Sequence, residues 1–311
     1  MNTPALTVVR DWARVPAEHD RGFGSRTHGV AILQDGRIAV LAQADPAMHL
    51  FDSEGRLAEC WGSGLHGAHG LTHVVEDGVE SFWITDQITG HVGQYSLSGR
   101  LLRTIEAPTD GLPYSPTQVA VAPNTRDIWV ADGYGSNVIR RYDRSGRWMS
   151  SLTGEDAPGC FARPHGLTFA GDGTLYVADR RNRRLIAYDE QGIYRFHVDG
   201  VAHSPCGFAI RDERLYVPEL FGGIKVFDRS LTLIGKIGRN VVNRPAGGWE
   251  GQADWGWPVL SDWPDWMSRE AAIDRWIAPH DVAVSPDGSM YVVEWVLGGR
   301  ITRVSGDKGE H

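Results

Sequence analysis

The chain has 311 residues, of which 41% are hydrophobic and 12 are tryptophan, so it is long enough to bury a large core. Its formal net charge of −8 argues against nucleic acid or an anionic membrane as a partner and leaves a small-molecule substrate as the expected one. The N-terminus has no basic segment followed by an apolar one, no apolar run approaches the ~18 residues of a membrane helix, and three scattered cysteines fit a reducing compartment. We therefore expect a cytoplasmic protein.

A unit of three or four short strands repeats six times along the chain, after one unpaired predicted strand at 6–12. The unit is clearest in residues 163–189. There, strands over 165–169, 174–178 and 185–188 are separated by an Asp-Gly turn and a polar corner. The start of the first strand carries an equivalent residue in every repeat, and in chain order these residues are His28, His69, Gln118, His165, Cys206 and His280.

Repeats of about 40–50 residues predict an all-β, six-bladed β-propeller forming a single domain over 1–311. The last repeat ends near Val304 with three strands, so the strand at 6–12 is expected to supply the fourth and close the ring. An insertion at about 241–276 carries six of the 12 tryptophans. It is either a hydrophobic plug or an aromatic wall over the channel, and in the second case Trp255 and Trp257 are expected to contact the substrate.

The first strands of a propeller line its central channel, so residues at one register form a ring around the axis. His69, His165 and His280 come from alternate blades, about 120° apart in a six-fold ring. Three imidazoles with an open fourth position are the ligand set of a catalytic zinc, although iron and manganese also fit.

The other three ring positions are expected to support that site. His28 is a hydrogen-bond donor to the ligands or a substrate contact. Gln118 and Cys206 fill the channel, and a Cys206 thiolate is an alternative fourth ligand that would close the site.

The repeats resemble NHL repeats, and their order resembles the catalytic core of peptidyl-α-hydroxyglycine α-amidating lyase, the lyase half of peptidylglycine α-amidating monooxygenase. The segments that carry the resemblance are Val130-Ala-Asp132-Gly133-Tyr134, Pro164-His165, Val177-Ala-Asp179-Arg180 and Pro279-His280-Asp281. It extends over nearly the whole predicted propeller.

The resemblance implies zinc on the three alternate histidines, Tyr134 as the catalytic tyrosine and Arg180 as an active-site arginine. It also implies a structural calcium bound by Asp281 and by the backbone carbonyl of Leu71. A second arginine of the family, in the first blade, has no counterpart, because residues 40–45 contain Gln43 and no arginine.

The chemistry of these residues is coherent. A substrate hydroxyl on the metal would lose its proton to Tyr134, and collapse to a carbonyl would break a C–N or C–O bond. Arg180 would hold a carboxylate or stabilise negative charge. The structural alternatives are a loop aromatic for Tyr134 and, for Arg180, an ion pair with Asp179 or Glu155.

The function expected from these patterns is a metal-dependent lyase for a small polar substrate. A first alternative keeps the metal but makes the protein a hydrolase, lactonase, hydratase or isomerase for a sugar-derived substrate. A second alternative is a non-catalytic NHL interaction module, which would bind no metal.

Overall fold

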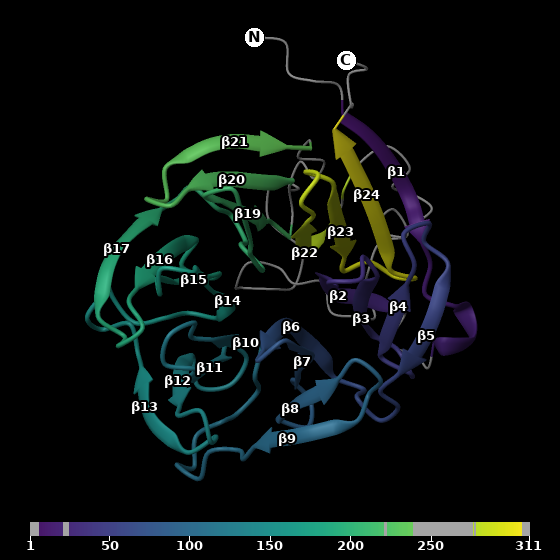
Figure 1. The fold of residues 1–311 in the computed structure, drawn as a ribbon. Coiled ribbons are helices and arrows are strands. Elements are labelled where there is room, and N and C mark those ends of the chain that lie inside the picture. Colours follow the sequence, from purple (N-terminus) through teal and green to yellow (C-terminus); the bar gives the residue numbers. More distant parts are fainter. Residues whose placement is uncertain (1–5, 21–24, 221–222, 239–275, 277, 307–311) are drawn as a thin grey trace, which may run out of the picture.

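The computed structural model describes residues 6–20, 25–220, 223–238, 276 and 278–306. Their strands form six four-stranded sheets arranged around a central axis (Figure 1). The predicted all-β, six-bladed propeller is therefore confirmed. Within the described ranges, no helix has the length and apolar character needed to cross a membrane.

Each sheet is one blade, and in blades one to five the strands run in sequence order from the axis to the rim. A short 3-10 turn, η1 (Ala17–His19), precedes blade one. Blade one consists of β2 (Arg26–Ile32), β3 (Ile38–Gln43), β4 (Met48–Phe51) and β5 (Leu57–Trp61). Blade two consists of β6 (Ala68–Glu76), β7 (Val79–Asp86), β8 (His91–Ser96) and β9 (Leu101–Ile105). Blade three consists of β10 (Gln118–Val121), β11 (Ile128–Asp132), β12 (Val138–Tyr142) and β13 (Trp148–Leu152).

Blades four to six follow the same plan. Blade four consists of β14 (Pro164–Phe169), β15 (Leu175–Asp179), β16 (Arg184–Tyr188) and β17 (Tyr194–Asp199). Blade five consists of β18 (Ala209–Arg211), β19 (Arg214–Pro218), β20 (Ile224–Asp228) and β21 (Leu233–Ile237). Blade six consists of β22 (Pro279–Val284), β23 (Met290–Glu294), β24 (Arg300–Gly306) and, from the other end of the chain, β1 (Leu6–Ala13).

The ring closes through β1, which pairs antiparallel with β24 from Leu6 opposite Gly306 to Val9 opposite Arg303. Figure 1 shows the purple and yellow strands side by side at this seam. The predicted closure of the ring by the N-terminal strand is confirmed.

The blades pack face to face, which explains why the middle strands read as unbroken apolar runs. Strand β15 is buried along its whole length. Leu175 and Val177 join a cluster that includes residues of blade three, whereas Tyr176 and Ala178 join a cluster with residues of blade five. Alternate side chains of one strand therefore contact opposite neighbouring blades. Burying each large side chain contributes about 1.5–3 kcal/mol.

Blade five departs from the expected pattern near the axis. Cys206 was expected on its first strand, but β18 begins only at Ala209. The backbone before it is held by a single bridge between Pro205 and Glu219. Almost all of the tryptophan-rich insertion, including Trp255 and Trp257, lies outside the described residues. Trp276, at its end, is buried between blades five and six.

Candidate metal centre

Four buried histidines line the axis, each from the innermost strand of its blade: His28 on β2, His69 on β6, His165 on β14 and His280 on β22. At each of them the pairing with the second strand of the blade shifts register, which marks a β-bulge. A bulge turns the side chain of the extra residue away from the regular alternation. The bulges therefore let these side chains leave the blade-to-blade core and point toward the axis.

Three of these histidines are anchored in the same way. The Nδ1–H group of His69 donates to the carbonyl of Thr117 over 2.8 Å, that of His165 to Cys206 over 2.8 Å, and that of His280 to His28 over 2.7 Å. Because a carbonyl only accepts, Nδ1 carries the proton in each ring and Nε2 carries a lone pair when the ring is neutral. Carbonyl anchors of this kind orient histidine ligands of metals.

Glycines after the histidines make these anchors possible. A Cβ atom on Gly70 would lie 2.4 Å from the Thr117 carbonyl oxygen, and one on Gly166 would lie 2.3 Å from the Cys206 carbonyl oxygen. The same two oxygens accept the Nδ1–H groups of His69 and His165. The His-Gly pairs of the sequence thus bring the next blade close enough to fix the imidazole.

The four rings form one compact cluster. His69 lies 4.8 Å from His28, 4.7 Å from His165 and 5.1 Å from His280, measured between ring centroids. His280 lies 4.6 Å from His28 and 5.0 Å from His165. One ligand atom from each of His28, His69 and His280 can be chosen so that all three lie within 4.8 Å of one another. The structure thus brings together the three predicted metal ligands and adds His28.

Burial keeps these imidazoles neutral. It lowers the pKa of His69 to about 3, and it also lowers the pKa values of His28, His165 and His280 well below the usual value. The Arg180 guanidinium and the neighbouring imidazoles lower several of them further. Neutral imidazole is the form that binds a metal ion.

Tyr134 and Arg180 lie beside this cluster. The Tyr134 hydroxyl is 3.3 Å from His69 Nε2 and 3.2 Å from His165 Nε2, and it accepts a hydrogen bond from Arg180 Nη1 over 3.2 Å. Burial raises the pKa of Tyr134, whereas the guanidinium groups of Arg180 and Arg163 lower it. The Arg163 guanidinium lies 5.9 Å from the centre of the Tyr134 ring, a contact that sequence reasoning did not find although Arg163 directly precedes Pro164-His165.

The Cys206 thiol is the second partner of Arg180. Arg180 Nη2 donates to Cys206 Sγ over 2.9 Å, and Nε donates to the Pro205 carbonyl over 3.3 Å. Burial raises the pKa of the Cys206 thiol to about 11, with Arg180 acting in the opposite direction. The structural alternative for Arg180 is an ion pair with Asp179 or Glu155. The Asp179 carboxylate pairs with Arg184 Nε at 2.7 Å.

Gln118 connects blades three and two away from the imidazoles. Its Nε2 donates to the Leu71 carbonyl over 3.1 Å and to the Thr72 hydroxyl over 2.9 Å. The carbonyl that accepts the Nδ1–H group of His69 belongs to the preceding residue, Thr117.

Asp281 and Leu71 lie on either side of β2. Asp281 Oδ2 accepts the amide of Val30 over 3.1 Å, and a Cβ on Gly29 would lie 2.5 Å from the Leu71 Cβ. Burial raises the pKa of Asp281 to about 7. These residues offer one carboxylate and one carbonyl of the six to eight oxygens that calcium takes.

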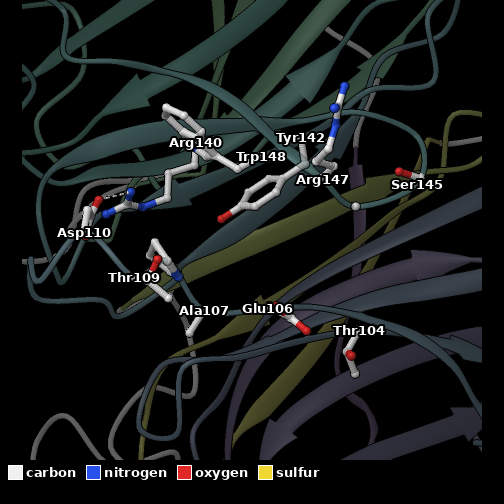
Figure 2. A pocket seen from close by; sticks show the side chains of 12 residues that line it. Thr104, Glu106, Ala107, Thr109, Asp110, Arg140, Tyr142, Ser145, Arg147 and Trp148 are labelled. Atoms are coloured by element: carbon white, nitrogen blue, oxygen red, sulfur yellow. Dashed lines mark hydrogen bonds and ion pairs between the residues drawn. The ribbon is translucent and has the colours of Figure 1, made fainter.

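A surface pocket of about 590 Å³ lies between blades two and three, away from these residues. Figure 2 shows Arg140 and Asp110 joined across it by an ion pair of 2.6 Å, with Tyr142 and Trp148 nearby. None of the residues that line it was predicted as a site residue.

Known proteins share this architecture and, at modest identity, this sequence. Residues 161–188, which hold β14 to β16, match the family described as NHL repeat. The chain is 27% identical over 309 residues to peptidyl-glycine alpha-amidating monooxygenase A of Xenopus laevis, covering 94% of this chain and 29% of that protein. It is 31% identical over 157 residues to a probable peptidyl-alpha-hydroxyglycine alpha-amidating lyase of Caenorhabditis elegans, covering 44% of this chain and 41% of that protein.

A solved structure confirms the fold alone. It is a catalytically inactive virginiamycin B lyase from Staphylococcus aureus with quinupristin, which matches with a TM-score of 0.62 at 14% identity over 97% of this chain and 99% of that chain. The chain spans less than half the length of the two curated relatives. It is a six-bladed β-propeller with an NHL repeat in its fourth blade, and it has homologues named as α-amidating lyases and monooxygenases.

Proposed function

We propose that the protein is a metal-dependent lyase that breaks a C–N bond in a small substrate with a hydroxyl group on the same carbon. The observation that carries the proposal is the separation of 3.1 Å between the Nε2 atoms of His69 and His165. Both rings already donate from Nδ1 to carbonyls, so two lone pairs face each other when the rings are neutral. A hydrogen bond between them would require one charged ring, which burial opposes.

A cation held between these two nitrogens would remove that repulsion. In a tetrahedral zinc site with Zn–N bonds of about 2.0 Å, two nitrogen ligands lie about 3.3 Å apart, close to the separation found here. His280 supplies the third imidazole, with its Nδ1 held in the same way. A divalent ion bound there would act as a Lewis acid, lowering the pKa of a substrate hydroxyl and of the adjacent Tyr134 phenol.

The chain's own residues then account for the proton and the charge. In its phenolate form Tyr134, held 3.2 Å from Arg180 Nη1, accepts the proton of the substrate hydroxyl. The oxygen's electron pair forms a C=O bond, the C–N bond breaks, and its electron pair stays on nitrogen, which takes a proton back from the phenol. Arg180 holds a substrate carboxylate or the negative charge that develops during this transfer.

The relatives favour this reaction over the alternatives, since one of them bears the name of an α-hydroxyglycine amidating lyase.

The test begins with metal content, measured by mass spectrometry on purified wild-type protein and on His165→Ala. His197→Ala is the matched control, because His197 lies on the outer strand β17 and pairs with Tyr194 and Asp199. We expect one equivalent of metal in the wild type and the control, and none in His165→Ala.

Substrate assays then identify the reaction. An α-hydroxyglycine peptide should release glyoxylate and a peptide amide, and a panel of lactones should remain intact. Lactone hydrolysis without amide release would replace the lyase by a hydrolase. Wild-type protein that neither contains nor takes up metal would overturn both the lyase and the hydrolase. A non-catalytic interaction module would then be the remaining interpretation.

A further inference from the structure

The fourth axial histidine, His28, differs from the other three in its hydrogen bonding. Its side chain is 3% exposed, and neither Nδ1 nor Nε2 has a hydrogen-bond partner among the described residues. Gln43 is a polar neighbour that favours the charged ring, but it lies outside hydrogen-bond geometry. A buried polar group without a partner costs about 1–3 kcal/mol, so this arrangement calls for a ligand.

The position of the His28 ring indicates which ligand. Its centroid lies 4.8 Å from His69 and 4.6 Å from His280. The three rings of the proposed site lie 4.7 to 5.1 Å from one another. Imidazoles bound to one tetrahedral zinc have centroids about 5 Å apart, given Zn–N bonds of about 2.0 Å. His28 thus stands from His69 and His280, although not from His165, at the spacing of a fellow ligand.

The backbone of His28 is already part of the site, because its carbonyl accepts the Nδ1–H group of His280 over 2.7 Å. The bulge between Thr27 and Gly29 turns the His28 side chain toward the axis. The His28 ring also lies in an edge-to-face arrangement with Trp295, with 6.2 Å between the ring centroids.

We propose that His28 is a fourth imidazole ligand of the axial metal, so that the resting site is a four-histidine site. The inference rests on the proposed function, which supplies the metal. It departs from the three-histidine arrangement expected from the sequence, because it adds the His28 imidazole to the residues that would hold the ion.

Ligand counting tests this proposal directly. Zn²⁺-loaded wild-type protein, His28→Ala and His28→Gln are compared by X-ray absorption, which counts imidazoles, and the Co²⁺-loaded proteins by visible absorption. We expect four imidazoles in the wild type and three in each variant, with a changed Co²⁺ spectrum. The affinity for Zn²⁺, from competition with a chelator, should fall by at least about tenfold. His28→Gln keeps a polar side chain of similar size and guards against a packing defect.

The outcomes separate this proposal from the one before it. Three imidazoles in the wild type, or equal affinity and spectra in all three proteins, would overturn the role of His28 while leaving the metal site in place. Loss of metal in His165→Ala but not in His28→Gln, with an unchanged spectrum in the latter, has the same meaning. A wild-type protein that binds neither Zn²⁺ nor Co²⁺ would overturn the metal site itself.

Discussion

Arg180 donates a hydrogen bond from Nη1 to the Tyr134 hydroxyl over 3.2 Å. Its other terminal nitrogen, Nη2, donates to Cys206 Sγ, so the guanidinium is fixed at two points. A lysine offers a single ammonium group and cannot reproduce this planar fork.

We therefore predict that Arg180→Lys lowers kcat by about 100-fold or more while metal content stays unchanged. The pKa of Tyr134 should rise, which moves the limb of the pH–rate profile that reports it to higher pH. Arg195→Lys is the control, since Arg195 pairs with Asp189 on the exterior of the same blade. An unchanged pH–rate profile in Arg180→Lys would show that Arg180 does not affect the pKa of Tyr134.

The three cysteines should differ sharply in reactivity. Cys60 and Cys160 are exposed, whereas Cys206 is buried with its sulfur against Arg180 Nη2. Because alkylation needs an accessible thiolate, iodoacetamide at pH 8 should modify Cys60 and Cys160 within minutes and leave Cys206 intact. Mass spectrometry of tryptic peptides measures this, and equal labelling of all three cysteines would contradict the structure.

Gly166 should tolerate no side chain. Its Cβ would meet the Cys206 carbonyl oxygen at 2.3 Å, a backbone atom that cannot move aside without releasing His165. We predict that Gly166→Ala lowers the melting temperature and weakens Zn²⁺ binding at least about tenfold. Gly171→Ala is the control, because a Cβ there meets nothing within 4 Å. Equal affinities for Zn²⁺ in both variants would show that the close approach of Gly166 to the Cys206 carbonyl does not orient the His165 imidazole.

Stability should depend on pH through His49, which is buried on β4 and lies 2.8 Å from His19, measured from Nε2 to Nδ1. Burial and His19 lower the pKa of His49 from 6.5 to about 4. The unfolded chain therefore takes up this proton at a higher pH than the folded protein, and stability falls as pH drops from 6.5 to 4.

In His49→Gln this contribution is absent. The variant should lose less stability than the wild type over that window, by up to about 1.4 kcal/mol per pH unit. Urea unfolding at pH 6.5, 5 and 4 measures the difference, and the axial histidines cancel because both proteins contain them. Parallel curves for the two proteins would contradict the assignment.

The repeated fold could be predicted because its signals are local. Alternating apolar residues and Asp-Gly turns placed the strands of blade four within one residue of β14, β15 and β16. The register residue of each repeat also identified the four axial histidines, since one position per blade must return to the axis.

The contacts within the site could not be predicted, because they depend on bulges and on the neighbouring blade. The sequence does not tell which carbonyl faces His165 Nδ1, and the answer, Cys206, lies 41 residues away. The contact of Arg163 with the Tyr134 ring depends on the corner before β14, where Arg163 adopts a φ of +57°. The repeat predicts a strand at Cys206, whereas β18 begins at Ala209.

The pairing of β1 with β24 has a consequence for the order of assembly. The last contact of the ring joins segments from opposite ends of the chain, from Leu6 to Gly306. Contacts between residues so far apart in sequence carry a large loop-closure entropy cost, which slows folding. His280 belongs to the blade completed by that seam, and its anchor is the carbonyl of His28 across the gap. The His280 imidazole is therefore oriented only once blades one and six are in contact, and an ion bound by His69, His165 and His280 would stabilise that contact.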